Sequence, residues 1–182
     1  VGILFIFTIL FLTFAPIFIF IFAPGFYFDD VKRELSVNVL RIMFPYFALI
    51  SLVAFAGSIQ NSHGRFSLPA ATPIIFNISL IAAAVFIAPV FEIPIFALAW
   101  GVLVAGFVQL AIQLLPLKQI NRLPIPRIDL SNPGSKKVFQ LMIPAILAGG
   151  IMQINLLVDT IYASLLVTGS PTWLYVSDRL IQ

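Results

Sequence analysis

The sequence of 182 residues contains no cysteine and a single histidine, and only 9% of its residues are charged. The absence of cysteine excludes disulfides, thiolate metal sites and cysteine nucleophiles. A soluble domain usually carries about a quarter charged residues, so the low charge excludes an ordinary cytosolic protein. It also excludes an intrinsically disordered chain, because disorder requires low hydrophobicity and high charge.

Apolar side chains are abundant instead. Hydrophobic residues make up 61% of the chain, with 19 Phe and 13 Pro, and the mean hydropathy is +1.11. Long uncharged runs of this composition predict an all-α fold, specifically a polytopic bundle of transmembrane helices. The net charge of +3 comes from the predicted loops. We therefore relate it to orientation in the membrane and expect no nucleic-acid partner.

The apolar runs predict about six membrane crossings, because a helix needs roughly 20 apolar residues to cross about 30 Å of hydrocarbon. Short polar turns separate most of them. The chain begins inside the first run and stops inside the last, so we expect it to be an internal fragment of a longer protein. The predicted spans are Val1–Ala23, Val37–Ile59, Leu68–Phe91, Pro94–Leu117, Val138–Val167 and a sixth span that begins at Trp173.

Lysine and arginine are distributed unequally between the two sides of these spans. The Gln60–Leu68 turn and the Lys118–Lys137 loop together carry six of them, whereas the opposite side carries three, namely Lys32, Arg33 and Arg41. The excess predicts that the first side faces the cytoplasm and that the first span runs from inside to outside. We expect Arg41 to reach the outer interface with its guanidinium.

Asp159 lies inside the fifth predicted span. A charge within the membrane costs roughly 2.5–3.5 kcal/mol on insertion scales, which makes such a residue a candidate for function. Asn155 and Tyr162 lie four residues before and three after it, on the same helical face. A carboxylate, an amide and a phenol in one stripe can hold a proton or a small cation such as Na⁺. The alternative is that the helix ends early and Asp159 lies at the interface.

Arg179 is the second charged candidate, at about 9 Å along the helix that begins at Trp173. Asp178 precedes it, but adjacent residues on a helix point about 100° apart and do not pair directly. A guanidinium inside the membrane suits an anionic ligand, above all a phosphate that it can bind with two hydrogen bonds. The alternative is a structural ion pair with another helix, for example with Asp159.

Two patterns in the fourth predicted span indicate helix packing. Gln109 and Gln113 are spaced by one helical turn and are expected to hold helices together. Ala97, Gly101 and Ala105 form a ridge of small residues that lets another helix approach closely. The sequence contains no Gly-rich phosphate loop, paired histidines or Ser-His-Asp arrangement, so it argues against an enzyme.

Several stretches together resemble the MurJ (MviN) family of lipid II flippases, within the multidrug/oligosaccharidyl-lipid/polysaccharide exporter superfamily. The resemblance extends in order over essentially the whole chain. The stretches that carry it are Arg41–Tyr46, Asn61–Phe66 with Pro69, Pro73 and Asn77, Gln153–Thr160 and Trp173–Leu180.

The resemblance implies a transporter of fourteen helices in two lobes, of which this chain would cover the third helix to the start of the eighth. Residues 1–117 would end the N-terminal lobe, residues 118–137 would form a cytoplasmic loop between the lobes, and residues 138–182 would begin the C-terminal lobe. The cytoplasmic N-terminus of the family places the first span from inside to outside, in agreement with the charge count.

The resemblance also implies a function: movement of lipid II, a polyprenyl diphosphate-sugar, from the inner to the outer leaflet of the bacterial plasma membrane by alternating access. Arg179 matches an arginine of a central cationic cavity in the family. Asp159 matches an acidic residue that some members link to a sodium site. The expected partners are therefore the lipid-linked substrate and membrane lipids, with Na⁺ or H⁺ as a coupling ion and no other cofactor.

Three other functions remain open from the sequence. One is an exporter of the same superfamily for polysaccharide lipids or drugs, although a drug antiporter would use acidic cavity residues where this chain has Arg179. Another is a membrane enzyme acting on polyprenyl phosphates, which would need an acidic or histidine cluster on a loop. The last is a structural scaffold, which would not need Arg179 inside the bilayer.

Overall fold

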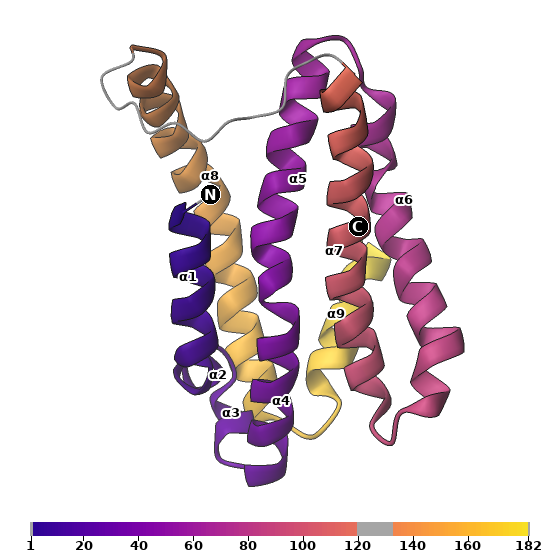
Figure 1. Ribbon diagram of the computed structural model, residues 1–182. Coiled ribbons are helices and arrows are strands. Elements are labelled where there is room, and N and C mark those ends of the chain that lie inside the picture. The colour runs from indigo at the N-terminus through magenta and orange to yellow at the C-terminus, as the bar shows by residue number, and fades with distance from the viewer. Residues whose placement is uncertain (1, 120–132, 182) are drawn as a thin grey trace. The chain divides into compact units, whose positions relative to one another are not determined.

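The computed structural model describes residues 2–119 and 133–181, which form helices and contain no strand. This confirms the predicted all-α class. Figure 1 shows these elements in chain order. They are α1 (Gly2–Thr13), α2 (Ala15–Phe22), α3 (Pro24–Tyr27), α4 (Asp30–Met43), α5 (Pro45–Ser62), α6 (Ser67–Ala82), the π-helix η1 (Ala83–Ile87), the 3₁₀-helix η2 (Ala88–Val90), α7 (Pro94–Gln119), α8 (Pro133–Leu165) and α9 (Ser170–Ile181).

Three described stretches are long and apolar enough to cross a membrane, namely Asp30–Ser62, Ser67–Val90 and Pro94–Lys118. They coincide with the second, third and fourth predicted spans. The pair α1 and α2 adds a fourth if it forms one broken span. Helix α8 has 33 residues and covers most of the fifth predicted span; at 1.5 Å per residue it is about 50 Å long.

The first predicted span differs from the structure, because its helix is interrupted at Phe14. Pro16 has no backbone N–H, so the carbonyl of Leu12, four residues earlier, lacks its usual donor within the helix. Arg41 supplies a donor from another element: its Nε lies 3.3 Å from the Leu12 carbonyl oxygen. The guanidinium expected at the outer interface therefore has a backbone partner at the interruption.

Helix α4 begins at Asp30, ahead of the predicted start at Val37. The reason is a cap: the Asp29 carboxylate accepts hydrogen bonds from the backbone amides of Val31 and Lys32, both at 3.1 Å. These amides belong to the first turn and have no partner within the helix. The polar segment between the first and second predicted spans, residues 24–36, is thus partly helical.

Helix α8 begins at Pro133, inside the stretch predicted as a loop from Lys118 to Lys137. Proline fits the first position of a helix, because its missing N–H would be unpaired there in any case. The end of the predicted loop is therefore helical. Residues 120–132 of that loop lie outside the described residues.

The chain divides into two compact units. Unit 1 comprises Val1–Ala15 and Leu35–Ile125, and unit 2 comprises Pro16–Glu34 and Pro126–Gln182. The lobes predicted from the sequence are divisions of a longer protein, and their boundaries stay a prediction.

In unit 1, helix α7 packs against both α5 and α6 (Figure 1). Ala97 and Ala105 on α7 are completely buried. A Cβ atom at Gly101 would lie 2.5 Å from the Cβ of Ala83 in η1, so the two elements approach too closely for any larger residue to fit without displacement. The predicted ridge of small residues is therefore confirmed as a packing surface.

Candidate functional site

Asp159 lines a cavity of about 490 Å³ between α8 and α9 in unit 2. Tyr162, one turn further along α8, lines the same cavity, as their predicted common face requires. Asn155 is exposed one turn before Asp159 and is not among the lining residues. The remaining lining residues are Ala163, Leu166, Ser170, Trp173, Leu174 and Ser177.

The two serine hydroxyls that line this cavity can accept hydrogen bonds or coordinate a cation. Ser170 Oγ donates to the carbonyl of Val167 at 2.8 Å, and Ser177 Oγ donates to the carbonyl of Leu174 at 2.9 Å. Since each proton is already engaged, the oxygen lone pairs remain for a ligand. One carboxylate together with hydroxyl oxygens suits a small hard cation.

The cavity does not have the ligand set of a transition-metal site. In the described ranges, no three His, Cys, Asp or Glu residues lie close enough together to hold a metal ion. Asp159 supplies one negative charge to the cavity, which fits a monovalent cation or a proton better than a divalent ion. The assignment of Asp159 and Asn155 to cation coupling stays a prediction.

Arg179 lies in the last turn of α9 and is exposed. Its Nε donates to the hydroxyl of Tyr175 at 3.3 Å, and its guanidinium carbon lies 5.5 Å from the centre of the Tyr175 ring. Tyr175 thus holds the guanidinium by its Nε and by a cation–π contact. Its two terminal nitrogens have the planar fork geometry with which arginines can bind a phosphate.

Tyr175 is a residue that the sequence reasoning missed. It precedes Arg179 by four residues, the spacing at which helical side chains meet, so the sequence did contain the signal. In the described part of the chain, Arg179 and Asp159 do not form an ion pair with each other. The assignment of Arg179 to substrate binding stays a prediction.

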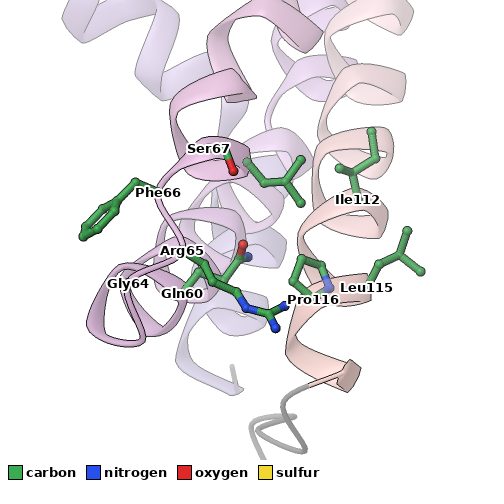
Figure 2. Close-up of a pocket in the computed structure, with 9 residues that line it drawn as sticks. Gln60, Gly64, Arg65, Phe66, Ser67, Ile112, Leu115 and Pro116 are labelled. Atoms are coloured by element: carbon green, nitrogen blue, oxygen red, sulfur yellow. The ribbon is translucent and has the colours of Figure 1, made fainter.

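A second cavity, of about 520 Å³, lies in unit 1 where the α5–α6 turn faces the end of α7. Arg65 extends from the turn towards Pro116, whereas Phe66 points away from the cavity (Figure 2). The wall on α7 is apolar and includes Ile112 and Leu115. This cavity lies on the side predicted to face the cytoplasm, and its arginine was counted in that prediction.

A buried amide network lies beneath this second cavity. Gln60 Nε2 donates to the backbone carbonyl of Gln113 at 3.1 Å and also to its side-chain oxygen. Gln113 Nε2 donates to Thr72 Oγ1 at 3.0 Å, and Gln109 Nε2 donates to the Thr72 carbonyl at 2.9 Å. The network ties α7 to α5 and α6. It confirms that Gln109 and Gln113 hold helices together.

The chain matches a known family over its whole length. The family described as "Lipid II flippase MurJ" matches residues 1–182. Similar proteins include the probable lipid II flippase MurJ of Buchnera aphidicola subsp. Acyrthosiphon pisum, which is 46% identical over 93% of this chain. The lipid II flippase MurJ of Burkholderia cenocepacia is 40% identical over 90% of the chain. The probable lipid II flippase MurJ of Haemophilus influenzae is 41% identical over 85%.

The chain spans about a third of the length of these relatives, with matched shares of 33%, 33% and 30%. The long apolar helices of the chain and the flippase relatives together identify a membrane protein.

Proposed function

Because this chain belongs to the lipid II flippase MurJ family, we propose that it forms part of a flippase that carries lipid II from the inner to the outer leaflet of the bacterial plasma membrane. The step is a movement of the lipid and breaks no covalent bond. The observation within the chain that supports this function is Arg179, a cation on a predicted membrane helix that Tyr175 holds by Nε.

The guanidinium of Arg179 fits the diphosphate of the lipid-linked precursor. Its planar fork can make two parallel hydrogen bonds to phosphate oxygens, which lysine cannot do. Tyr175 fixes the orientation of this fork, so less side-chain entropy is lost when the diphosphate binds. Arginines elsewhere in the longer protein would share the remaining charge of the diphosphate.

Transport follows by alternating access. The sugar headgroup enters a hydrated cavity from the cytoplasmic side while the polyprenyl tail stays in the bilayer, and rocking of the two lobes then exposes the headgroup outside. A cation held at Asp159 couples this movement to the membrane potential, which is worth about 2.3 kcal/mol per charge per 100 mV.

The experiment that tests this function uses the full-length protein in cells depleted of their own flippase. We expect Arg179→Ala to abolish growth, Arg179→Lys to restore it only weakly because lysine lacks the planar fork, and Tyr175→Phe to have an intermediate effect. Membrane insertion is checked for each variant by the amount of protein in the membrane fraction.

The matched control is Arg33→Ala, which removes an arginine from the polar segment of residues 24–36, where Arg33 pairs with Asp30 at 2.8 Å. This variant should grow normally. Normal growth of the Arg179→Ala cells, with lipid II appearing outside at the usual rate, would contradict the proposed role of Arg179.

A further inference from the structure

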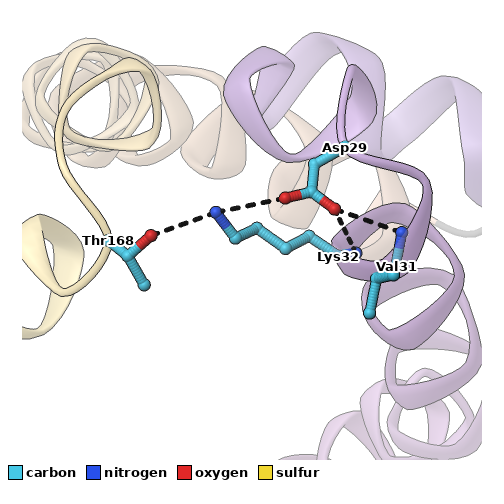
Figure 3. Close-up of polar contacts among 4 residues, drawn as sticks. All are labelled: Asp29, Val31, Lys32 and Thr168. Carbon is cyan, nitrogen blue, oxygen red and sulfur yellow. Dashed lines mark hydrogen bonds and ion pairs between the residues drawn. The ribbon is translucent and has the colours of Figure 1, made fainter.

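The segment from α3 to the first turn of α4, which we call the connector, is fastened within unit 2 to the last turn of α8 and to the turn that follows it. The backbone amide of Gly25 donates to Ser164 Oγ at 3.3 Å. The ammonium of Lys32 donates to Thr168 Oγ1 at 3.1 Å (Figure 3). These partners are 139 and 136 residues apart in the sequence. We refer to Gly25, Asp29, Lys32, Ser164 and Thr168 as the connector clasp.

The first contact of the connector clasp requires a glycine. A Cβ atom at position 25 would lie 1.8 Å from the backbone carbonyl oxygen of Ser164 and 2.4 Å from its carbon. Since both are backbone atoms near the end of a helix, no rotation of a side chain can make room. Ser164 is buried here, at 6% exposure. The amide–hydroxyl bond therefore exists only while α3 and α8 touch directly.

The second contact depends on the Lys32 ammonium, which Asp29 of the connector holds in place. The Asp29 carboxylate lies 3.3 Å from the Lys32 ammonium, and the same carboxylate caps α4. Lys32 thus bridges Asp29 and Thr168 (Figure 3). The side chains of Lys32 and Asp29 are 38% and 41% exposed, so water competes for these bonds and they exchange readily.

The contact joins two turns that the sequence places on the same side of the membrane. The connector precedes the second predicted span and the Thr168 turn follows the fifth, so an even number of crossings separates them. The lysine and arginine count places this side outside the cell. The predicted loop between the lobes, residues 118–137, lies between the two turns in the sequence. The connector clasp therefore links the predicted lobes at their outer ends.

The connector clasp also adjoins the cation cavity. Ala163 lines that cavity, and the next residue, Ser164, accepts the Gly25 amide. Leu166 and Ser170 line the cavity on either side of Thr168. The last turn of α8 and the turn after it thus belong to both structures, and a displacement of this segment alters both.

We propose that the connector clasp closes the outer side of the protein and must separate each time the headgroup is released outside. This inference rests on the proposed function for its role in transport, whereas the existence of an opening clasp does not depend on it. The exposed Lys32–Thr168 bond and the Gly25–Ser164 bond, which needs a direct approach of two backbones, suit a contact that forms and breaks repeatedly.

The first experiment measures opening directly. This chain has no cysteine of its own; in a full-length protein from which any other cysteine has been removed, Ser164→Cys introduces a single thiol that is covered while the clasp is closed. We expect slow labelling by a membrane-impermeant maleimide added outside to cells that contain the full-length protein. Adding Gly25→Ala should accelerate labelling about tenfold, because the methyl group prevents closure. Lys32→Met should give a smaller acceleration without a steric conflict.

The matched control is Gly149→Ala, which adds the same methyl group to α8 at a position with no atom within 4 Å. Its labelling rate should equal that of the parent. Equal rates in the parent, Gly25→Ala and Lys32→Met proteins would overturn the connector clasp.

The second experiment tests its role in transport. Lys32→Cys and Thr168→Cys are joined by a short bismaleimide in the full-length protein, and lipid II movement is measured before and after. We expect the cross-linked protein to lose most of its activity, whereas the single variants Lys32→Cys and Thr168→Cys each keep, after the same treatment, the activity that they had before it. Full movement of lipid II by cross-linked protein would overturn the inference. Absence of movement before cross-linking would instead contradict the proposed function, and the labelling rates would still decide whether the clasp opens.

Discussion

The two units use their polar side chains in opposite ways. In unit 1, Gln109 and Gln113 are almost completely buried, at 1% and 2% exposure, and bond to Thr72 on a neighbouring helix. In unit 2, Asp159 and Arg179 are exposed in this chain, and the bond of Arg179 goes to its own helix. Residues of both kinds look alike in an apolar sequence. Only their partners separate those that hold helices together from those that a ligand can reach.

The largest expected loss of stability is at Gly101 in unit 1, where α7 and η1 approach closely. Gly101→Val places new atoms 2.5 Å from Ala83, and we expect a loss of about 3 kcal/mol in the free energy of unfolding. The measurement is denaturant unfolding of the full-length protein in detergent. Gly149→Val in unit 2, where a Cβ meets nothing within 4 Å, should cost less; equal losses would refute the close packing of α7 on η1.

The amide network should give the next largest effect. Gln113→Leu removes the side-chain oxygen that accepts from Gln60 Nε2 and the Nε2 that donates to Thr72, whereas the backbone carbonyl at position 113 remains an acceptor for Gln60. We expect a loss of about 1–2 kcal/mol in the free energy of unfolding. Gln60 Oε1 already lacks a hydrogen-bond partner among the described residues. The double variant Gln60→Leu with Gln113→Leu should therefore recover part of the loss. A double variant that is less stable by the sum of both single losses would show that the two residues are not coupled.

Asp159 should behave in the opposite way, with a small effect on stability and a large one on function. Asp159→Asn is expected to change the free energy of unfolding by less than about 0.5 kcal/mol, because the side chain is exposed and its charge is not used in packing. Lipid II movement by this variant should no longer depend on Na⁺ or on the membrane potential. Movement that keeps its dependence on either would remove Asp159 from cation coupling.

The smallest effect concerns pH at the connector clasp. The backbone amide of Lys32 donates to the Asp29 carboxylate and lowers its pKa, with further lowering by the Lys32 ammonium and the Val31 amide, while partial desolvation acts in the opposite direction. A lowered pKa contributes stability above the unfolded value, and this stability is lost as the pH falls through the folded value. The unfolding midpoint of the parent should therefore exceed that of Asp29→Asn at neutral pH. The two midpoints should converge in acid; a constant difference would argue against the cap.

The sequence correctly predicted the features that depend only on spacing along one helix. The ridge at Gly101 and the pairing role of Gln109 and Gln113 followed from positions on one helix, and the common face of Asp159 and Tyr162 did so too. The partners on other helices did not follow. Gln60 and Thr72 meet the α7 glutamines only because of how α5 and α6 cross α7, which no spacing within one segment specifies.

The errors concerned helix ends and interruptions. Val1–Ala23 is uniformly apolar and predicted one span, although Pro16 marked the point at which a carbonyl would lose its donor. The early start of α4 required the side-chain cap by Asp29, and the start of α8 at Pro133 required proline to begin a helix instead of ending one. In the candidate site, the helical period predicted that Asp159 and Tyr162 share a face, whereas Asn155 of the same predicted stripe does not line the cavity. Ser170, Ser177 and Trp173 join the cavity only through the packing of α9 on α8.

The hydrogen bond from Arg41 to the Leu12 carbonyl has a consequence for biosynthesis. The two residues are 29 positions apart, so the ribosome completes the first apolar segment before its arginine partner has been made. A carbonyl without a donor is costly in hydrocarbon, and so is an arginine that arrives alone. Each cost is offset by the other residue, so the first two segments should leave the translocon together as a hairpin.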